Sequence, residues 1–420
     1  MSEIETHKTI EAVWRIEQAR LVAGLTRMVR NISIAEELAA DALLIALEAW
    51  PQSGVPRNPG AWLMAAAKRK AIDQFRRQKM AQRKLDEVGR DLGEEELQVP
   101  DYDTALDDDV GDDLLRLIFT SCHPLLSREA RLALTLRLIG GLSTAEIARA
   151  FLVPEPTIAQ RVVRAKRAIA EAGVPFEVPR GDERAKRLAS VLEVIYLIFN
   201  EGYSATAGDD WMRPELVEEA LRLGRIVAHL LPDEAEVHGL VALMEIQASR
   251  SRARVAPDGS PILLFAQNRA LWDRLLIGRG LAALERAEAL SATRGPYTLQ
   301  AGIAACHARA RRPDETDWGR IVALYSILAE VAPNPVVDLN RAVAVSFFAG
   351  PAAGLELIDQ LAALPMLKGY HLLPSVRADL LFKLGRMGEA GAEFRRAAEL
   401  TSNAKERSLL LARAAQCAAA

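Results

Sequence analysis

The sequence contains few of the residues that staple a small fold or bind a metal. Its 420 residues include three cysteines, Cys122, Cys306 and Cys417, which lie far apart and form no CxxC pair. This spacing excludes a disulfide scaffold and a four-thiolate zinc site, and it is typical of a protein from a reducing compartment. Aromatic residues make up only 5% of the chain, which argues against a long β-sandwich.

The usual signatures of catalysis are also missing. The chain has no GxxxxGK[ST], GxGxxG, HExxH or GxSxG motif, so nucleotide hydrolysis, dinucleotide binding, zinc proteolysis and α/β-hydrolase chemistry lack their residues. The six histidines are scattered, and the adjacent Cys122 and His123 are too close together to form a multidentate site alone. We therefore predict no catalytic residue, no cofactor and no metal, and expect the protein not to be an enzyme.

Long apolar runs are absent as well. No stretch of about 18 apolar residues occurs, and the polar N-terminus lacks the apolar segment of a signal peptide. We expect a cytoplasmic protein with no membrane partner.

Half of the residues are hydrophobic and 26% are charged, with alanine, leucine and arginine abundant, which is typical of a helix-rich protein. The length predicts two to four domains. Charge is unevenly distributed although the net charge is only -3. Residues 57–90 hold ten basic residues against three acids, residues 91–113 hold eleven acids and no basic residue, and residues 127–170 hold eight basic residues against three acids.

The acidic stretch has little apolar periodicity and reads as a solvated linker. A second interruption, rich in proline and glycine, lies at residues 173–183. We therefore predict an all-α fold with helical domains at 8–90 and 114–173, a linker at 91–113, and a helical array at 183–420.

The first basic region predicts an amphipathic helix that begins near Asn58 and Pro59. Leu63, Ala67 and Ala71 form an apolar stripe that also includes Phe75, so Phe75 is expected in the core. The preceding segment, residues 33–50, predicts an acidic amphipathic helix. A solvated surface helix is the alternative interpretation of the basic face.

The second basic region predicts a helix-turn-helix. Ser143 and Glu146 form a capping-box pattern before a short helix from Thr144 to Phe151. After LVPEP, a second helix is expected from Thr157 to about Ala170, with Pro156 in its first turn. Four residues should face inward and four outward: Ile158, Val162, Ala165 and Ile169 against Gln160, Arg161, Arg164 and Arg167. Such a helix can enter a major groove, although a helical hairpin with a solvated basic face is the alternative.

In this order, the motifs AEELAADALLIALEAW, AWLMAAAKRKAIDQFRRQ and the helix-turn-helix resemble bacterial extracytoplasmic-function (group IV) sigma factors. The long C-terminal region, with YLIFNEGYSA and PVVDLNRAVAV, is similar to the subgroup with a tetratricopeptide-like extension. The resemblance implies binding to core RNA polymerase, through its clamp helices and flap, and to promoter DNA. It also implies an inter-domain linker in the RNA path of the polymerase, where the acidic residues could mimic nucleic acid.

The resemblance also implies roles for individual residues. Asp73, Arg76 and Arg77 match the usual pattern of the segment that reads the -10 element, whereas Arg69 stands where asparagine is frequent. Ala159 replaces a common lysine in the recognition helix. The implied contact residues are Lys68, Arg69, Asp73, Arg76 and Arg77 for the -10 element, Thr157, Gln160, Arg161, Arg164 and Lys166 for the -35 element, and Glu36, Glu37, Asp41, Leu44 and Trp50 for the polymerase. Trp62 and Phe75 are candidates to stack on bases of the opened strand.

The C-terminal region predicts irregular stacked helix pairs, one of which, at residues 375–400, has the spacing of a tetratricopeptide unit. Two polar-aromatic groups in this region could line a pocket for an unknown ligand or could be core and surface ion pairs. They are Tyr196, Phe199, Asn200, Glu201 and Tyr203, and then Gln267, Asn268, Arg269, Trp272, Asp273 and Arg274; Asn340 and Arg341 are a similar case.

We expect the extension to regulate the sigma activity, through a ligand or a protein. Two other functions stay open: a ligand-sensing helix-turn-helix regulator, and a tetratricopeptide-like protein-interaction scaffold.

Overall fold

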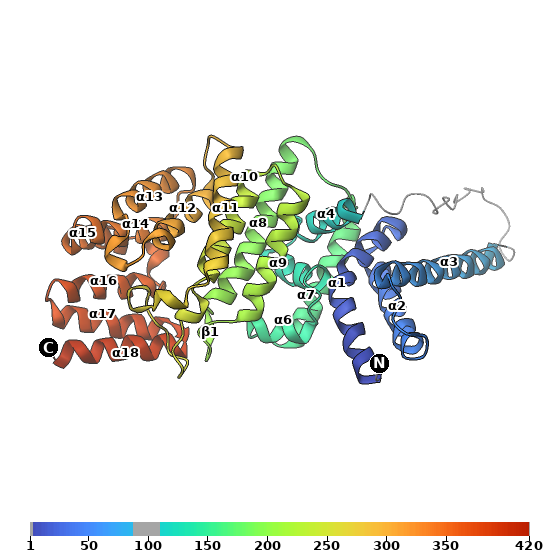
Figure 1. Ribbon diagram of the computed structural model, residues 1–420, viewed down its shortest axis with the longest axis horizontal. Coiled ribbons are helices and arrows are strands. Elements are labelled where there is room, and N and C mark those ends of the chain that lie inside the picture. The colour runs from blue at the N-terminus through green and yellow to red at the C-terminus, as the bar shows by residue number, and fades with distance from the viewer. Residues whose placement is uncertain (1–2, 87–109, 420) are drawn as a thin grey trace. The chain divides into compact units, whose positions relative to one another are not determined.

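The computed structural model describes residues 3–86 and 110–419, and these residues are mostly helical (Figure 1). The prediction of an all-α fold is confirmed. The chain divides into two compact units, residues 1–194 (unit 1) and residues 195–420 (unit 2). The acidic residues 91–109 of the predicted linker lie outside the described part of the chain.

Unit 1 begins with three helices, α1 (Glu3–Val29), α2 (Ile32–Ser53) and α3 (Pro59–Asp86). Asn31 caps α2 by accepting hydrogen bonds from the backbone N–H groups of Ser33 and Ile34, at 2.9 and 3.2 Å. Asn58 does the same for α3 through the N–H of Ala61, at 3.1 Å. The expected start of the basic helix is therefore correct, since asparagine at these positions satisfies N–H groups that the helix leaves unpaired.

Four shorter helices follow in unit 1: α4 (Val110–Ser121), α5 (Arg128–Leu138), α6 (Thr144–Phe151) and α7 (Glu155–Glu171). Helix α4 begins inside the segment predicted as a linker, so residues 110–113 belong to the folded unit instead. The physical reason is Asp113, whose side chain is only 4% exposed and pairs with Arg116 at 2.6 Å and with Arg27 of α1 at 3.2 Å. Charge alone made this residue look like part of a solvated segment.

Helix α8 (Gly181–Tyr203) runs across the division between the units. Its first half packs on α4 and α5. Arg187 donates to the carbonyl of Phe119 at 2.9 Å and Ser190 to the carbonyl of Cys122 at 2.6 Å. Glu193 pairs with Arg131 at 3.1 Å. These contacts explain why unit 1 ends at Val194 and not at the proline- and glycine-rich stretch before α8.

Unit 2 is an array of stacked helices in which most helices pack against their neighbours in the chain, whereas α12 packs chiefly against α10. The longer helices are α9 (Pro214–Leu230), α10 (Ala235–Ala248), α11 (Arg274–Leu290), α12 (Pro296–Arg309), α13 (Trp318–Val331), α14 (Pro335–Phe348), α15 (Pro351–Ala362), α16 (Leu372–Lys383), α17 (Met387–Leu400) and α18 (Ala404–Ala419). Short 3₁₀ turns, η1 to η5, lie at Ser251–Ala253, Leu264–Ala266, Arg269–Leu271, Pro313–Glu315 and Pro365–Leu367. The expectation of stacked helix pairs is confirmed.

Prolines mark the helix starts of this array. Four of its helices, α9, α12, α14 and α15, have proline in the first turn, where its missing N–H would be unpaired anyway. The pair α16 and α17 turns at Gly385, whose φ of 75° is readily adopted by glycine. This is the helix pair that the spacing at residues 375–400 predicts.

Two-residue strands connect distant parts of unit 2. Strand β1 (Ala207–Gly208) pairs in parallel with β2 (Ser402–Asn403). Asn403, 1% exposed, donates from Nδ2 to the carbonyls of Ala205 and Asp210, at 3.1 and 2.9 Å. The start of α18 is therefore held against the loop that follows α8. Among the helices that the structure describes, none combines the length and apolarity that a membrane crossing requires.

Candidate nucleic-acid interface

The helix-turn-helix of unit 1 starts with the expected capping box. Ser143 Oγ accepts a hydrogen bond from the backbone N–H of Glu146 at 3.2 Å, and Glu146 Oε2 accepts one from the N–H of Ser143 at 2.8 Å. The bond from Ser143 holds the pKa of the Glu146 carboxyl below its ordinary value. The cap fixes where α6 begins, so the prediction of a helix from Thr144 to Phe151 is confirmed.

The turn between α6 and α7 has a defined geometry. Leu152 adopts the left-handed conformation, with φ 50° and ψ 42°, and its N–H bonds back to α6. Thr144 at the start of α6 donates to Glu155 Oε1 at the start of α7, at 2.9 Å. Helix α7 therefore begins at Glu155, two residues before the expected Thr157, with Pro156 in its first turn as predicted.

The two faces of α7 are divided as the sequence predicts. Ile158, Val162, Ala165 and Ile169 are buried. On the other side Gln160 and Arg164 are exposed, and Thr157 and Arg161 are half-buried. Arg167 pairs with Glu171 one turn later, at 2.6 Å. The exposed side presents an amide and guanidinium groups in a row, which is suited to hydrogen bonds with base edges and to phosphate contacts.

Lys166, the fifth residue predicted to contact the -35 element, points elsewhere. Its ammonium forms an ion pair with Glu36 of α2, and Arg137 of α5 reaches the same carboxylate at 3.6 Å. The side chains of Glu36 and Lys166 are only 12% and 17% exposed. A residue predicted to contact the polymerase, Glu36, is therefore ion-paired with a residue predicted to contact DNA, Lys166. No signal in the sequence indicates this pairing.

The basic helix α3 exposes most of its predicted contact residues. Arg69, Asp73 and Arg76 are exposed and Lys68 is half-buried, whereas the side chain of Arg77 lies outside the described residues. Phe75 is 42% exposed, so the expectation that it belongs to the core is wrong. It lies one turn beyond Ala71, where the stripe leaves the packed part of the unit.

The predicted polymerase surface on α2 is partly exposed. Glu37 is exposed, Leu44 is 58% exposed, and Asp41 pairs with Lys70 of α3 at 3.6 Å. Trp50 is 1% exposed and packs edge-on against Trp62, with ring centroids 5.3 Å apart. Because it continues the buried i, i+4 row of Leu38, Ala42 and Ala46, Trp50 is a core residue and not part of the contact surface.

Cys122, next to His123, has protein partners of its own. The Cys122 thiol is buried and lies 3.3 Å from Thr135 Oγ1, and burial raises its pKa. In the described residues, no three or more histidine, cysteine or acidic side chains gather in a position to hold a metal ion.

The polar-aromatic groups of unit 2 are partly structural. Phe199 is fully buried, Tyr203 stacks on it with centroids 5.4 Å apart, and Glu201 pairs with Arg213. Tyr196 donates to Gln300 Oε1 at 3.1 Å. Asp273 caps α11, and Arg341 pairs with Asp338 at 3.3 Å.

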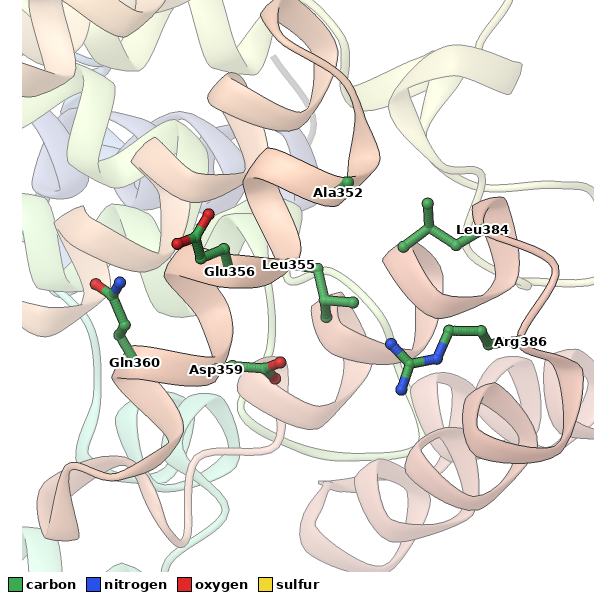
Figure 2. A pocket seen from close by; sticks show the side chains of 7 residues that line it. All are labelled: Ala352, Leu355, Glu356, Asp359, Gln360, Leu384 and Arg386. Atoms are coloured by element: carbon green, nitrogen blue, oxygen red, sulfur yellow. The ribbon is translucent and has the colours of Figure 1, made fainter.

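A hollow on the surface of unit 2 lies along α15 and the turn before α17. It is lined by Ala352, Leu355, Glu356, Asp359, Gln360, Leu384 and Arg386. In Figure 2 the carboxylate of Asp359 and the guanidinium of Arg386 face this hollow from opposite sides. Each has a partner of its own, Arg377 for Asp359 at 2.7 Å and Glu389 for Arg386 at 2.6 Å. The hollow therefore holds compensated charges at a shallow, solvent-open position.

Comparisons with known proteins find three family matches along the chain. Residues 14–80 match the family Sigma-70 region 2, and residues 116–169 match Sigma-70, region 4. Residues 187–288 match a family of unknown function, DUF6596. The chain is 44% identical over 387 residues to an uncharacterized protein of Rhizobium meliloti (strain 1021), an alignment that covers 92% of this chain and 90% of that protein.

Proposed function

The chain belongs to the extracytoplasmic-function sigma factors that carry an additional C-terminal domain, and we propose which of its surfaces bind promoter DNA and which bind the polymerase. Sigma factors bind core RNA polymerase and promoter DNA, and they are not enzymes. We propose that the exposed side of α7 reads the -35 element, that α3 reads and helps to open the -10 element, and that α2 contacts the polymerase clamp helices, with the flap as a further contact of unit 1. Such a protein acts in the cytoplasm.

The observation that carries this proposal is that α7 has one buried apolar side and one polar, cationic side. Four apolar side chains are buried on one side, while Gln160, Arg161 and Arg164 lie on the other side together with Thr157. Guanidinium groups bind guanine edges in pairs of hydrogen bonds and bind phosphates by charge. For α3, exposed Phe75 and Arg76 supply a ring and a cation that suit an unpaired strand. For α2, the proposed contacts are Glu36, Glu37, Asp41 and Leu44.

Two other functions fit less well. A ligand-sensing regulator with a helix-turn-helix alone has no use for a region 2, and residues 14–80 match that region. A tetratricopeptide-like scaffold accounts for the stacked helices of unit 2, but not for the capped helix-turn-helix and its cationic face.

The proposal is tested by transcription with purified components. The full-length protein is added to core polymerase and to a template with the promoter upstream of its own operon, and the run-off transcript is measured. Replacing Gln160, Arg161 and Arg164 by alanine should abolish transcription and -35 binding while leaving polymerase binding intact. Arg167→Ala is the control for the loss of one exposed arginine of the same helix, because Arg167 is outside the residues proposed to contact the -35 element and pairs with Glu171. Equal loss of both kinds of binding would contradict the assigned roles.

We propose that unit 2 regulates this activity. A chain that ends at Val194 keeps the contacts of Arg187, Ser190 and Glu193 with α4, the residue that follows it, and α5, so it is the suitable truncation. Transcript yield per folded molecule should differ between this chain and the full-length protein. Equal yields would contradict a regulatory role.

A further inference from the structure

Three arginines gather around two aromatic rings in unit 2. Arg250 follows α10, and its Nη2 donates to Tyr203 Oη at 2.7 Å. Its guanidinium carbon lies 5.8 Å from the ring centres of both Tyr203 and Trp272. Arg254 lies over Tyr203 at 3.5 Å, and Arg269 over Trp272 at 4.6 Å. The residues come from α8, the segment after α10, and η3, so the fold assembles this arginine cluster from separate parts of the chain.

The arginine cluster lacks an acidic partner. Of the carboxylates that the structure describes, none lies within 4.0 Å of a guanidinium nitrogen of Arg250, Arg254 or Arg269. Glu315, the acid that acts on Arg269 from farther away, is already paired with Arg312 at 3.2 Å.

Other arginines of unit 2 with comparable burial are neutralised. Arg225 pairs with Glu245 at 2.9 Å, Arg377 with Asp359 at 2.7 Å, and Arg413 with Asp379 at 2.8 Å. The arginine cluster therefore differs from these three arginines, each of which has a carboxylate partner.

Like charges inside the arginine cluster act on one another. Burial and the neighbouring Arg250 both lower the pKa of Arg254, which is only 8% exposed. Burial, Arg250 and Arg269 lower the pKa of His307 to about 4, so His307 stays neutral at pH 7 and adds no charge. An anion placed here would relieve this repulsion.

Polar atoms without partners lie in the same region. Trp272 Nε1 and Trp211 Nε1 are buried N–H donors with no hydrogen-bond acceptor among the described residues, and Arg269 Nε is a third such donor. Trp272 is 4% exposed, and Trp211 lies 5.7 Å from Arg254. Arg254 Nη1 donates to the carbonyl of Tyr203, and Arg269 Nη1 donates to the carbonyls of His307 and Ala310 at 2.7 and 2.6 Å, so these guanidinium groups are partly satisfied. Buried donors are nearly always bonded in folded proteins, so the donors that stay unpaired, beside guanidinium groups with no carboxylate partner, favour an acceptor supplied from outside.

We propose that the arginine cluster binds the oxyanion of a small molecule, a phosphate or carboxylate group held by Arg250 and Arg269 beside Trp272. The forked guanidinium matches either group with paired hydrogen bonds. Arg250 and Arg269 are both partly open to solvent, whereas Arg254 and Trp272 are buried. A compact group reaches this position more readily than an extended polymer does. The site does not depend on the roles proposed for unit 1.

The test uses the full-length protein and calorimetric titration with inorganic phosphate, pyrophosphate and citrate at constant ionic strength. The wild type should bind at least one of these probes, and Arg250→Gln should bind it at least tenfold more weakly. Arg252→Gln is the matched control, because Arg252 is an exposed arginine two residues away and its loss changes the net charge equally. The control should bind like the wild type.

Thermal unfolding separates a binding role from a structural one. If the cluster binds an anion, the probe that binds should raise the melting temperature of the wild type and should raise that of Arg250→Gln much less. If Arg250 only supports the fold through Tyr203 and Trp272, the probe should shift both melting temperatures equally, and the proposal is overturned. Arg250→Lys keeps the charge without the fork and should lose affinity while it retains the wild-type melting temperature.

Two further outcomes overturn the proposal. One is that no probe binds, or that Arg250→Gln and Arg252→Gln bind equally well. The other is that a single-stranded oligonucleotide or a polyglutamate peptide binds in an Arg250-dependent way while the small oxyanions do not, which would assign the cluster to a macromolecule instead.

Discussion

Glu36→Gln should release the recognition helix of unit 1. In the structure the Glu36 carboxylate holds Lys166 of α7 and lies 3.6 Å from Arg137, with Glu36 and Lys166 only 12% and 17% exposed. While Lys166 is held there it cannot neutralise a phosphate. The amide of glutamine keeps the size of the side chain and removes the charge, so the contact weakens without a new cavity.

The magnitude follows from the burial. Exposed ion pairs contribute about 0–1 kcal/mol, and removing one partner of a buried pair costs about 3–5 kcal/mol. A pair that is mostly but not fully buried lies between these limits, at about 1.5–3 kcal/mol. Since about 1.4 kcal/mol corresponds to a tenfold change in an equilibrium constant, binding of α7 to DNA should tighten by about tenfold or more.

The assay is fluorescence anisotropy of a labelled -35 duplex, titrated with full-length protein at several salt concentrations. One additional phosphate contact steepens the dependence of log affinity on log salt by about 0.9, so the variant should show both tighter binding and a steeper slope. Glu37→Gln is the control, because Glu37 is the exposed neighbour and the net charge changes equally. If the two variants bind alike, with equal slopes, the contact with Lys166 does not restrain the recognition helix and the reasoning fails.

Three other perturbations test the packing. Ser143→Ala should lower the free energy of unfolding of unit 1 by about 1 kcal/mol, because it removes the cap of α6. The midpoint of unfolding should move to a lower urea concentration, and an unchanged midpoint would contradict the cap's role. The pKa of Glu146 is lowered in the folded state, so its contribution to the free energy of unfolding is present above pH 4.5, its ordinary pKa, and is lost as the pH falls further. Below pH 4.5 the urea midpoint should therefore drop more in the wild type than in Glu146→Gln, and equal drops would contradict this. Gly239→Ala should destabilise unit 2 by about 1–3 kcal/mol, because a Cβ there would lie 2.5 Å from Thr298 Oγ1 and 2.7 Å from its backbone nitrogen; a wild-type melting temperature would show that α10 and α12 can separate freely.

Local signals predicted the helix-turn-helix best. The capping box, the inward and outward residues of α7 and the proline in its first turn each depend on neighbours within four residues, and all are found as expected. Helix α7 begins two residues early because Glu155 is held by Thr144, a side-chain bond across the turn that spacing alone does not reveal.

Errors arose where the environment of a residue is set from a distance. Trp50 looked like the exposed end of an acidic helix, but Trp62 of the next helix packs against it. Asp113 looked like the end of a solvated linker, but Arg27 from the first helix pairs with it. In both cases the partner comes from another helix, and periodicity within one segment carries no information on it.

The candidate ligand site shows the same limit. The sequence drew attention to Arg269 and Trp272 because polar and aromatic residues are dense there. Arg250, Arg254 and Tyr203 join them only through the packing of α8, α10 and η3. The missing counter-charge, which is the feature that distinguishes this cluster from an ordinary core, is a property of the assembled unit and of no single segment.

The pairing of Glu36 with Lys166 links the two proposed interfaces of unit 1. A partner that draws Glu36 toward itself frees Lys166, and a phosphate that draws Lys166 away frees Glu36. Because coupling free energies are reciprocal, polymerase bound at α2 should tighten DNA binding at α7 by the same factor by which DNA tightens polymerase binding. In Glu36→Gln that factor should shrink toward one even though DNA binding by the free protein improves. A mutual enhancement of equal size in wild type and variant would mean that the two surfaces communicate by another route.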